Sequence, residues 1–160
     1  MKLETNARDL LFQELEEYLQ NQEWKKANDQ TRKIIINIGD KDQQGYLTIH
    51  DLEYFPCEQL QRIDDLWVNN SDGRFGFTVQ RQIWLDCGGK IGEYEGGSVA
   101  YEQFSERVGY GDVRTDIGHI WSSNEPIPMG HLPTCPCSDR TINDGPTIHL
   151  LAQKLDKCGI

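Results

Sequence analysis

The sequence predicts an all-α fold, a compact orthogonal bundle of helices in a single domain that spans residues 1–160. Two observations support this prediction. Apolar residues recur every three or four positions in several separate segments, which places them on one face of a helix. Glycine, proline and asparagine interrupt the chain between these segments, as expected at helix ends. With 160 residues, of which 37% are hydrophobic, the chain is long enough to enclose one core.

Two helices are predicted at the start of the chain. The first covers residues 7–20 and carries four leucines at helical spacing, Leu10, Leu11, Leu15 and Leu19. The second covers residues 22–38, and its inner face holds Trp24, Ala27, Thr31, Ile34, Ile35 and Ile38. We expect Asn21 to cap this second helix and Gly39 to end it in a left-handed turn.

Three further helices are predicted in the middle of the chain. Pro56 suits the start of the first of these, whose apolar stripe consists of Leu60, Ile63, Leu66 and Trp67. The second covers residues 75–87, after a break at residues 71–73, and the third covers residues 98–109. We expect a hydrophobic core that contains Ile63, Trp67, Phe75, Val79 and Ile83, with Val99, Phe104 and Val108 mostly buried as well.

The stretch from Tyr110 to Pro146 follows no helical period and contains glycine, asparagine and proline throughout. An irregular stretch of this length inside a compact domain is usually functional or disordered. Residues 146–160 regain a helical pattern and are expected to form the C-terminal helix.

The charge and the cysteines of the chain indicate its compartment and partners. The formal net charge is −10, which opposes binding to the phosphates of a nucleic acid. No apolar run approaches the ~20 residues that span a membrane, and the acidic N-terminus resembles neither a signal nor a transit peptide. We therefore expect a cytoplasmic protein. Its five cysteines, an odd number without a secretion signal, are expected to be reduced thiols.

The segment DKDQQGYLTIHD, residues 40–51, resembles a calcium-binding loop. Its ligand positions and turn glycine would be Asp40, Asp42, Gln44, Gly45 and Asp51. The match is imperfect, because Gln44 is a neutral amide and Asp51 has a shorter side chain than the usual glutamate. Pro56 would also interrupt the exiting helix. Two interpretations therefore stay open, a solvated acidic turn and a weak calcium site in a helix–loop–helix.

The central block FPCEQLQRIDDLWVNNSDGRFGFTVQRQIW, residues 55–84, resembles the core signature of the genomes-uncoupled-four family. Further matches are WKKANDQT at 24–31, RVGY at 107–110, GHLP at 130–133 and the terminal LLAQKLDKCGI at 150–160. The resemblance covers residues 8–160 and is to single-domain members of the family. The core of this domain would be at about 8–133, followed by a C-terminal loop and helix at 134–160.

The resemblance implies a fold like a cupped hand, in which two long loops form a ligand cleft. Members of this family bind tetrapyrroles: protoporphyrin, its magnesium form and, in some, a linear bilin. They are not catalysts, so no catalytic cofactor is expected. The best-known members stimulate magnesium chelatase in chlorophyll synthesis, which makes the large subunit of that enzyme a candidate partner. In a phototrophic eukaryote the implied location is the plastid stroma.

The resemblance also points to the residues that would contact the tetrapyrrole. The first loop would present Tyr46, Leu47, Ile49 and Leu52. The second would cover a ring face with Ile117, Ile120, Trp121, Ile127 and Met129. Arg114 and Arg140 could meet the propionates, since guanidinium groups suit carboxylates. The alternatives are plain core packing for each apolar residue and a solvated surface charge for each arginine.

Two cysteines separated by one residue, Cys135 and Cys137, could anchor a bilin through a covalent bond or could be ordinary loop thiols. His131 is expected to make a structural hydrogen bond. The sequence contains no nucleophilic triad order, zinc-protease pair or phosphate loop. A rival interpretation is a protein-interaction or sensor module that kept the fold and lost the ligand.

Overall fold

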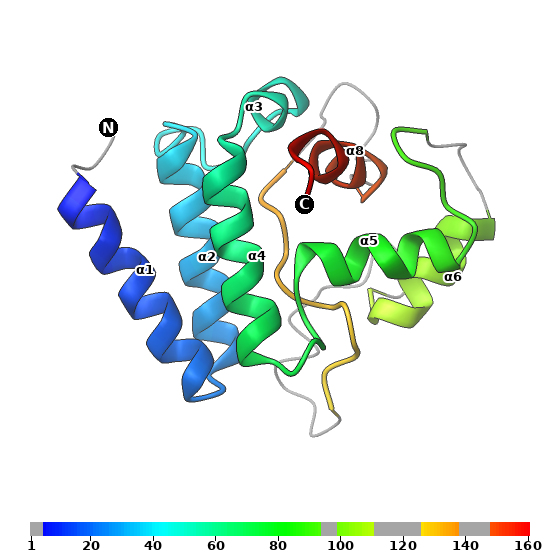
Figure 1. Cartoon of the computed structure of the whole chain (residues 1–160), viewed down its shortest axis with the longest axis horizontal. Coiled ribbons are helices and arrows are strands. Elements are labelled where there is room, and N and C mark those ends of the chain that lie inside the picture. The colour runs from blue at the N-terminus through cyan, green and yellow to red at the C-terminus, as the bar shows by residue number, and fades with distance from the viewer. Residues whose placement is uncertain (1–4, 94–98, 111–125, 138–147) are drawn as a thin grey trace.

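A computed structural model of the chain describes residues 5–93, 99–110, 126–137 and 148–160. These residues form helices and two isolated β-bridges, and no strand, which confirms the all-α prediction. The helices are α1 Thr5–Gln20, α2 Trp24–Ile38, α3 Ile49–Glu53, α4 Cys57–Asn70, α5 Phe77–Asp86, α6 Val99–Val108 and α8 Ile148–Cys158 (Figure 1). Within the described ranges, no helix is both long and apolar enough to cross a membrane.

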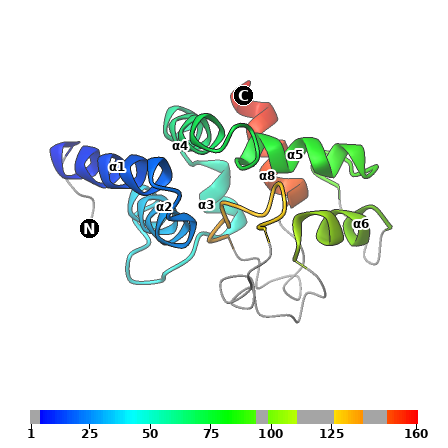
Figure 2. The same ribbon diagram turned by 90° about the horizontal axis from the view of Figure 1, so that it is seen from below.

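The helices form two groups that meet near the middle of the molecule. Helix α1 packs against α2 and α4, whereas α5 packs against α8 and α6. Helix α5 runs across the direction of α4 (Figures 1 and 2), which is the orthogonal arrangement that the sequence predicts. The short α3 contacts α8 and so joins the two groups on one side.

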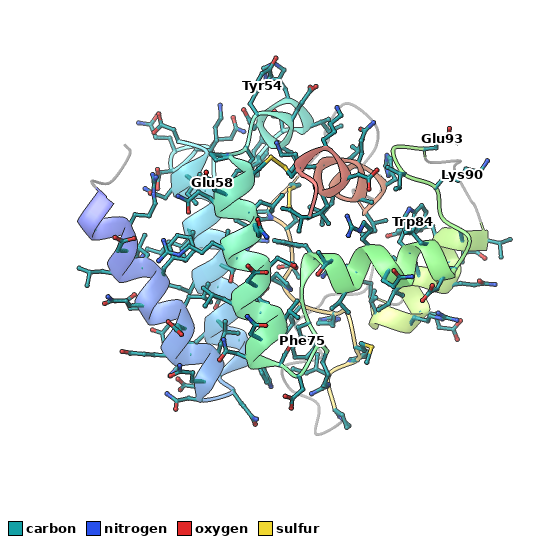
Figure 3. The ribbon with its side chains drawn as sticks, viewed as in Figure 1. Tyr54, Glu58, Phe75, Trp84, Lys90 and Glu93 are labelled. Carbon is teal, nitrogen blue, oxygen red and sulfur yellow. A yellow bond between two sulfur atoms is a disulfide. The ribbon has the colours of Figure 1, made fainter. Side chains whose placement is uncertain are left out.

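Two buried clusters hold these groups together. The larger is centred on Trp67, whose indole N–H donates to the Thr31 hydroxyl at 2.9 Å, while its ring lies 6.1 Å from that of Phe75. Figure 3 labels Phe75 at the foot of α4 and Trp84 on α5, where Trp84 forms the smaller cluster with Phe104. The predicted core is confirmed at Ile63, Trp67, Phe75 and Ile83, which are buried, and Val79 is half-buried.

The turn between α4 and α5 is fastened by side chains of both helices. The hydroxyl of Ser71 accepts from the Phe75 amide at 3.0 Å, and the buried carboxylate of Asp64 accepts from the Thr78 amide and hydroxyl at 2.9 and 2.7 Å. Burial raises the pKa of Asp64, although the Thr78 hydrogen bonds oppose the change. Gly76 has φ 139°, so α5 begins at Phe77 and not at Phe75 as predicted.

Several local predictions at helix ends are wrong. Glu23, not Asn21, is the N-cap of α2, and it makes no side-chain cap hydrogen bond. Gly39 has φ −75°, and the left-handed residue is Asp40 with φ 58°. A glycine is still needed at 39, because a Cβ there would lie 2.6 Å from a methyl of Leu47.

Two apolar residues that were expected inside lie outside. Leu10 is 58% exposed and Val99 is 65% exposed. Leu10 lies on α1, for which α2 and α4 are the main partners, so the other face of that helix stays in solvent. Helical spacing identifies a face but not how much of it another element covers.

Candidate functional site

A loop that we call the finger, residues 39–48, leaves the end of α2 and returns to the base of the molecule at α3. Its turn is closed by a hydrogen bond from the Gly45 amide to the Lys41 carbonyl at 2.7 Å, with Gly45 at φ 83°. After this turn the Leu47 amide donates to the Pro136 carbonyl at 2.7 Å, and Leu47 forms a parallel bridge with Cys137. The finger is thus attached to a second, distant segment of the chain.

That second segment, which we call the inner segment, comprises residues 126–137. The backbone amide of Gly76 donates to the Leu132 carbonyl at 3.0 Å, and the side-chain amide of Gln80 donates to the Pro133 carbonyl at 2.9 Å. Asn28 of α2 accepts from the Thr134 amide at 2.8 Å. The inner segment therefore contacts α2, α5 and the finger.

His131 confirms the expected structural hydrogen bond within the inner segment. Its ring Nδ1 lies 2.7 Å from the Val108 carbonyl, and a carbonyl only accepts, so Nδ1 carries the proton and donates. Burial lowers the pKa of His131, although the Val108 carbonyl favours its charged form. Tyr110 donates from its hydroxyl to the His131 carbonyl at 3.2 Å, which ties the end of α6 to the same point.

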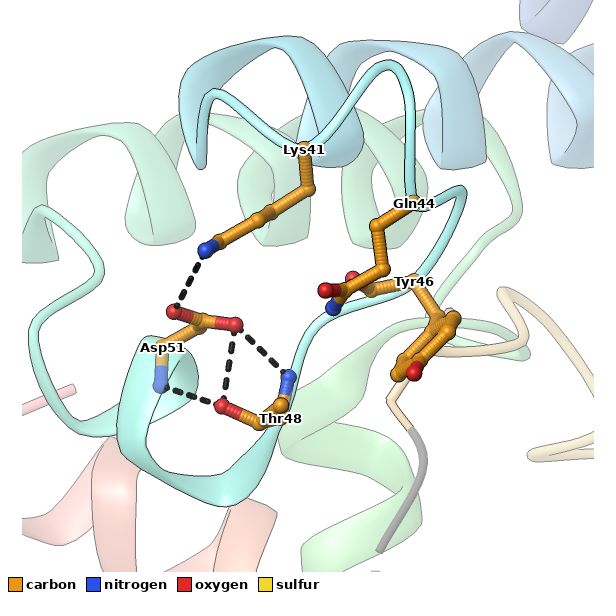
Figure 4. Close-up of polar contacts among 5 residues, drawn as sticks. All are labelled: Lys41, Gln44, Tyr46, Thr48 and Asp51. Atoms are coloured by element: carbon orange, nitrogen blue, oxygen red, sulfur yellow. Dashed lines mark hydrogen bonds and ion pairs between the residues drawn. The ribbon is translucent and has the colours of Figure 1, made fainter. Parts of the chain in front are cut away.

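The carboxylate of Asp51 joins the finger to the first turn of α3 (Figure 4). It accepts from the Thr48 amide and hydroxyl, both at 2.9 Å, while Thr48 accepts from the Asp51 amide, which completes a capping box. The Lys41 ammonium lies 3.4 Å from the other carboxylate oxygen. Burial opposes the charge of Asp51, but the Thr48 hydrogen bonds and the Lys41 charge outweigh it and lower its pKa.

These contacts bear on the calcium interpretation of residues 40–51. Asp51, the twelfth position of that loop, already uses its two oxygens to hold Thr48 and Lys41. Gln44 donates from its side chain to the Tyr46 carbonyl at 2.9 Å. No group of three or more acidic, histidine or cysteine side chains in the described part of the chain is arranged to hold a metal ion. In this structure Asp51 helps to cap α3, and the calcium interpretation of residues 40–51 stays a prediction.

A hollow lies between α3 and α8, next to the finger. Its apolar walls are Ile49, Leu52 and Leu150, and its polar side consists of Glu53, Gln153, Lys154 and Lys157. The space within it is about 380 Å³, including the open mouth of the hollow. The Lys154 ammonium donates to the Glu53 carbonyl at 2.7 Å, and the Lys157 ammonium lies 3.7 Å from the Glu53 carboxylate.

Comparison with known proteins identifies the family. The model of the GUN4-like family matches residues 5–143. The chain belongs to the GUN4 family. The resemblance to the genomes-uncoupled-four signature is therefore confirmed, and the finger and the inner segment can be considered as parts of a GUN4 domain.

The relatives in this family share most of the chain. The chloroplast protein of Arabidopsis thaliana named tetrapyrrole-binding protein is 34% identical over 129 residues, which cover 77% of this chain and 48% of that protein. A Ycf53-like protein of Synechocystis is 28% identical over 130 residues, which cover 80% of this chain and 52% of that protein. The chain thus spans about half the length of the curated relatives that it matches.

Solved GUN4 structures share the fold. The ligand-free GUN4 of Arabidopsis thaliana has a TM-score of 0.65 at 29% identity, with 89% of this chain and 93% of that chain covered. GUN4 of Chlamydomonas reinhardtii has a TM-score of 0.66 at 20% identity, with 91% and 86% covered, which is a likeness in fold.

The predicted contacts of the first loop divide into two kinds in this GUN4 domain. Tyr46 and Ile49 are half-buried and keep accessible surface. Leu47 and Leu52 instead belong to the hydrophobic core, with exposed fractions of 0% and 4%. The Leu47 side chain therefore packs from the finger against the helical base, and its role as a ligand contact stays a prediction. The reason is the alternation of an extended segment, which turns Tyr46 outward when Leu47 points inward.

The predicted contacts of the second loop are described only in part. Ile127 is half-buried and packs against the larger core cluster, while Met129 is 54% exposed. The Arg74 guanidinium donates to the Ile127 carbonyl at 2.5 Å and so anchors this part of the inner segment. Arg114, Ile117, Ile120, Trp121 and Arg140 lie outside the described residues, and their roles stay predictions.

The prediction of reduced thiols is wrong for four of the cysteines. Cys57 and Cys158 form a disulfide with a Cα–Cα distance of 5.4 Å, and Cys135 and Cys137 form another. Cys87 is a free, buried cysteine. A covalent bilin anchor at Cys135 or Cys137 would require reduction of their disulfide first. The sequence separates Cys57 from Cys158 by 101 positions, so only the fold reveals that α4 and α8 bring them together.

Lys154 and Lys157 of α8 are polar groups of the hollow that the sequence did not single out. The exposed fraction of Lys154 is 7%. Burial lowers its pKa, and the nearby charge of Lys157 lowers it further against the attraction of Glu53. A lysine beside the apolar stripe of a C-terminal helix carries no sequence signal of burial, because such residues normally extend into solvent.

Proposed function

We propose that this GUN4-family chain is a noncatalytic protein that binds a tetrapyrrole, namely protoporphyrin, its magnesium form or a linear bilin. The observation that carries the proposal is its 34% identity over 129 residues with a relative named tetrapyrrole-binding protein. A flat apolar ligand needs a broad apolar surface with a few polar groups at its edge. Tyr46 of the finger and Ile49 of α3 keep accessible surface for such contacts, and hydrogen bonds of Asp51 and Leu47 fasten the finger beside them.

The test is a titration of the protein with protoporphyrin, followed by absorption and by tryptophan fluorescence. We expect a saturable spectral change at micromolar ligand. Tyr46→Ala should weaken binding about tenfold, the effect of losing one central aromatic contact. Tyr54→Ala is the matched control, because Tyr54 is 73% exposed and points away from the molecule (Figure 3). Absence of any saturable change in the wild-type protein would reject the proposal.

We also propose a regulatory role in tetrapyrrole synthesis, with the large subunit of magnesium chelatase as partner and the cytoplasm or the plastid stroma as location. The family resemblance of residues 8–160 supports this role. The measurement is the rate of magnesium insertion into protoporphyrin by the assembled chelatase, with and without the protein. A higher rate with the protein is expected, and an unchanged rate at saturating protein would contradict the role.

A second candidate is an interaction or sensor module of the same fold that binds no tetrapyrrole. The burial of Leu47 and Leu52 in the core favours it, because these side chains are already covered without a ligand. The same titration separates the two candidates. The module would leave the spectra of protoporphyrin and of a bilin unchanged, whereas the first candidate changes at least one of them.

A further inference from the structure

We propose that the hollow between α3 and α8 binds a carboxylate carried on a short apolar arm. The inference rests on the proposed function, because the propionates of a tetrapyrrole are such groups, but it concerns a subsite that the family resemblance does not assign. The sequence offered Arg114 and Arg140 for these acids, whereas the cations that line the hollow are Lys154 and Lys157.

The first argument is that the Lys154 ammonium is buried and has few partners. It is a buried cation that lines the hollow and can donate three hydrogen bonds. The Glu53 carbonyl accepts one of them at 2.7 Å, and no carboxylate of the described residues lies within ion-pair distance of it. The charge of Glu53 acts on Lys154 only from beyond ion-pair distance, so a carboxylate in direct contact would offset more of the cost of burying this ammonium.

The second argument is the convergence of like charges. Lys157 contributes a second ammonium to the same hollow, and the presence of its charge lowers the pKa of Lys154. Glu53 faces both lysines, but its carboxylate is 55% exposed and meets only Lys157, at 3.7 Å. An ion pair between two exposed side chains at 3.7 Å contributes little to stability and rearranges easily. Lys157 can therefore turn from Glu53 toward a bound anion.

The third argument is the composition and size of the hollow. Ile49, Leu52 and Leu150 make its remaining wall, so a group that enters must be apolar along its stem and charged at its tip. The hollow contains about 380 Å³ of space with its open mouth included, so it admits a side arm and not a whole macrocycle. Ile49 follows directly after the finger in the chain, so the hollow begins where the finger ends.

The experiment compares protoporphyrin with its dimethyl ester, which lacks the charged acids, in titrations of the wild-type protein and of three variants. Lys154→Met removes the buried ammonium and keeps an apolar stem, and Lys157→Gln removes the second charge. Lys25→Gln is the control, a surface lysine of α2 whose side chain is 61% exposed and pairs with Asp29. Circular dichroism and thermal melting establish that each variant is folded.

We expect the wild-type protein and the control to bind the diacid at least tenfold more tightly than the ester. Lys154→Met and Lys157→Gln should reduce this preference to threefold or less while the affinity for the ester stays the same. If both variants keep the full preference, the subsite is wrong while tetrapyrrole binding stands.

A separate probe covers the case in which the wild-type protein binds neither porphyrin. Hexanoate carries the same acid on a short apolar chain and can be titrated by methyl NMR. Saturable shifts confined to Ile49, Leu52 and Leu150, and lost in Lys154→Met, would support the subsite although the proposed function had failed. Absence of such shifts at millimolar hexanoate would overturn the subsite in that case.

Discussion

The backbone amide of Leu47 donates a 2.7 Å hydrogen bond to the carbonyl of Pro136, while the Leu47 side chain is completely buried in the core. One residue therefore joins the finger to the inner segment through its backbone and to the helical base through its side chain. The finger and the inner segment depend on this connection for their relative position.

Leu47→Ala should lower the free energy of unfolding by about 2–5 kcal/mol, because it removes buried methyl groups and leaves a cavity. Urea denaturation followed by circular dichroism measures the change. Met129→Ala is the control, since Met129 is 54% exposed and should change stability by less than about 0.5 kcal/mol. Equal effects of the two substitutions would show that Leu47 is not a core residue.

Asp51→Asn should lower the free energy of unfolding at pH 7 by about 1 kcal/mol, because it weakens the capping box and removes the charge paired with Lys41. The pKa of Asp51 is lower in the folded protein, so the unfolded chain binds its proton more readily. The contribution is therefore complete above the unfolded pKa, and it is lost as the pH falls through the folded pKa.

Denaturation from pH 7 down to pH 3 checks this dependence. The stability difference between the wild-type protein and Asp51→Asn should shrink toward zero at the acid end. Glu16→Gln serves as control, because Glu16 is exposed on α1. A difference that grew toward low pH would contradict the lowered pKa.

Gly76→Ala should destabilise the protein by about 1–3 kcal/mol more than Gly88→Ala, since overpacking is added to backbone strain. Both glycines have positive φ, 139° for Gly76 and 88° for Gly88. A Cβ at 76 would lie 2.6 Å from Val68 and 2.9 Å from the Asp64 carboxylate, whereas one at 88 meets nothing within 4 Å. Thermal melting of both variants gives the comparison, and equal losses would argue against close packing at Gly76.

Replacing Cys57 and Cys158 together by serine should lower the free energy of unfolding by about 4–5 kcal/mol, because their disulfide closes a loop on the order of 100 residues. The corresponding double variant of Cys135 and Cys137 should lose only about 1–2 kcal/mol, since its loop is very short. Urea denaturation without reductant measures both. A larger loss for the second pair would contradict the loop-length argument.

The outcomes at particular residues show how far sequence reasoning extended. The period of Leu60, Ile63 and Trp67 correctly predicted a buried helix face, because one helix turn relates these residues directly. The same reasoning failed at Leu10 and Val99, since exposure depends on what another element covers. It could not show that Leu47 packs into the core, and the predicted ligand contact of this residue stays a prediction.

The amino-acid sequence by itself determined the helical class, most helix boundaries within a few residues and, through its motifs, membership of the GUN4 family. These properties depend on neighbours a few positions apart or on the order of recognisable motifs along the chain. The tertiary structure alone decided which residues of the finger face inward, which cysteines pair and that Lys154 of α8 is buried beside α3. Each of these depends on contacts between residues far apart in the chain, and local spacing contains no information about such contacts.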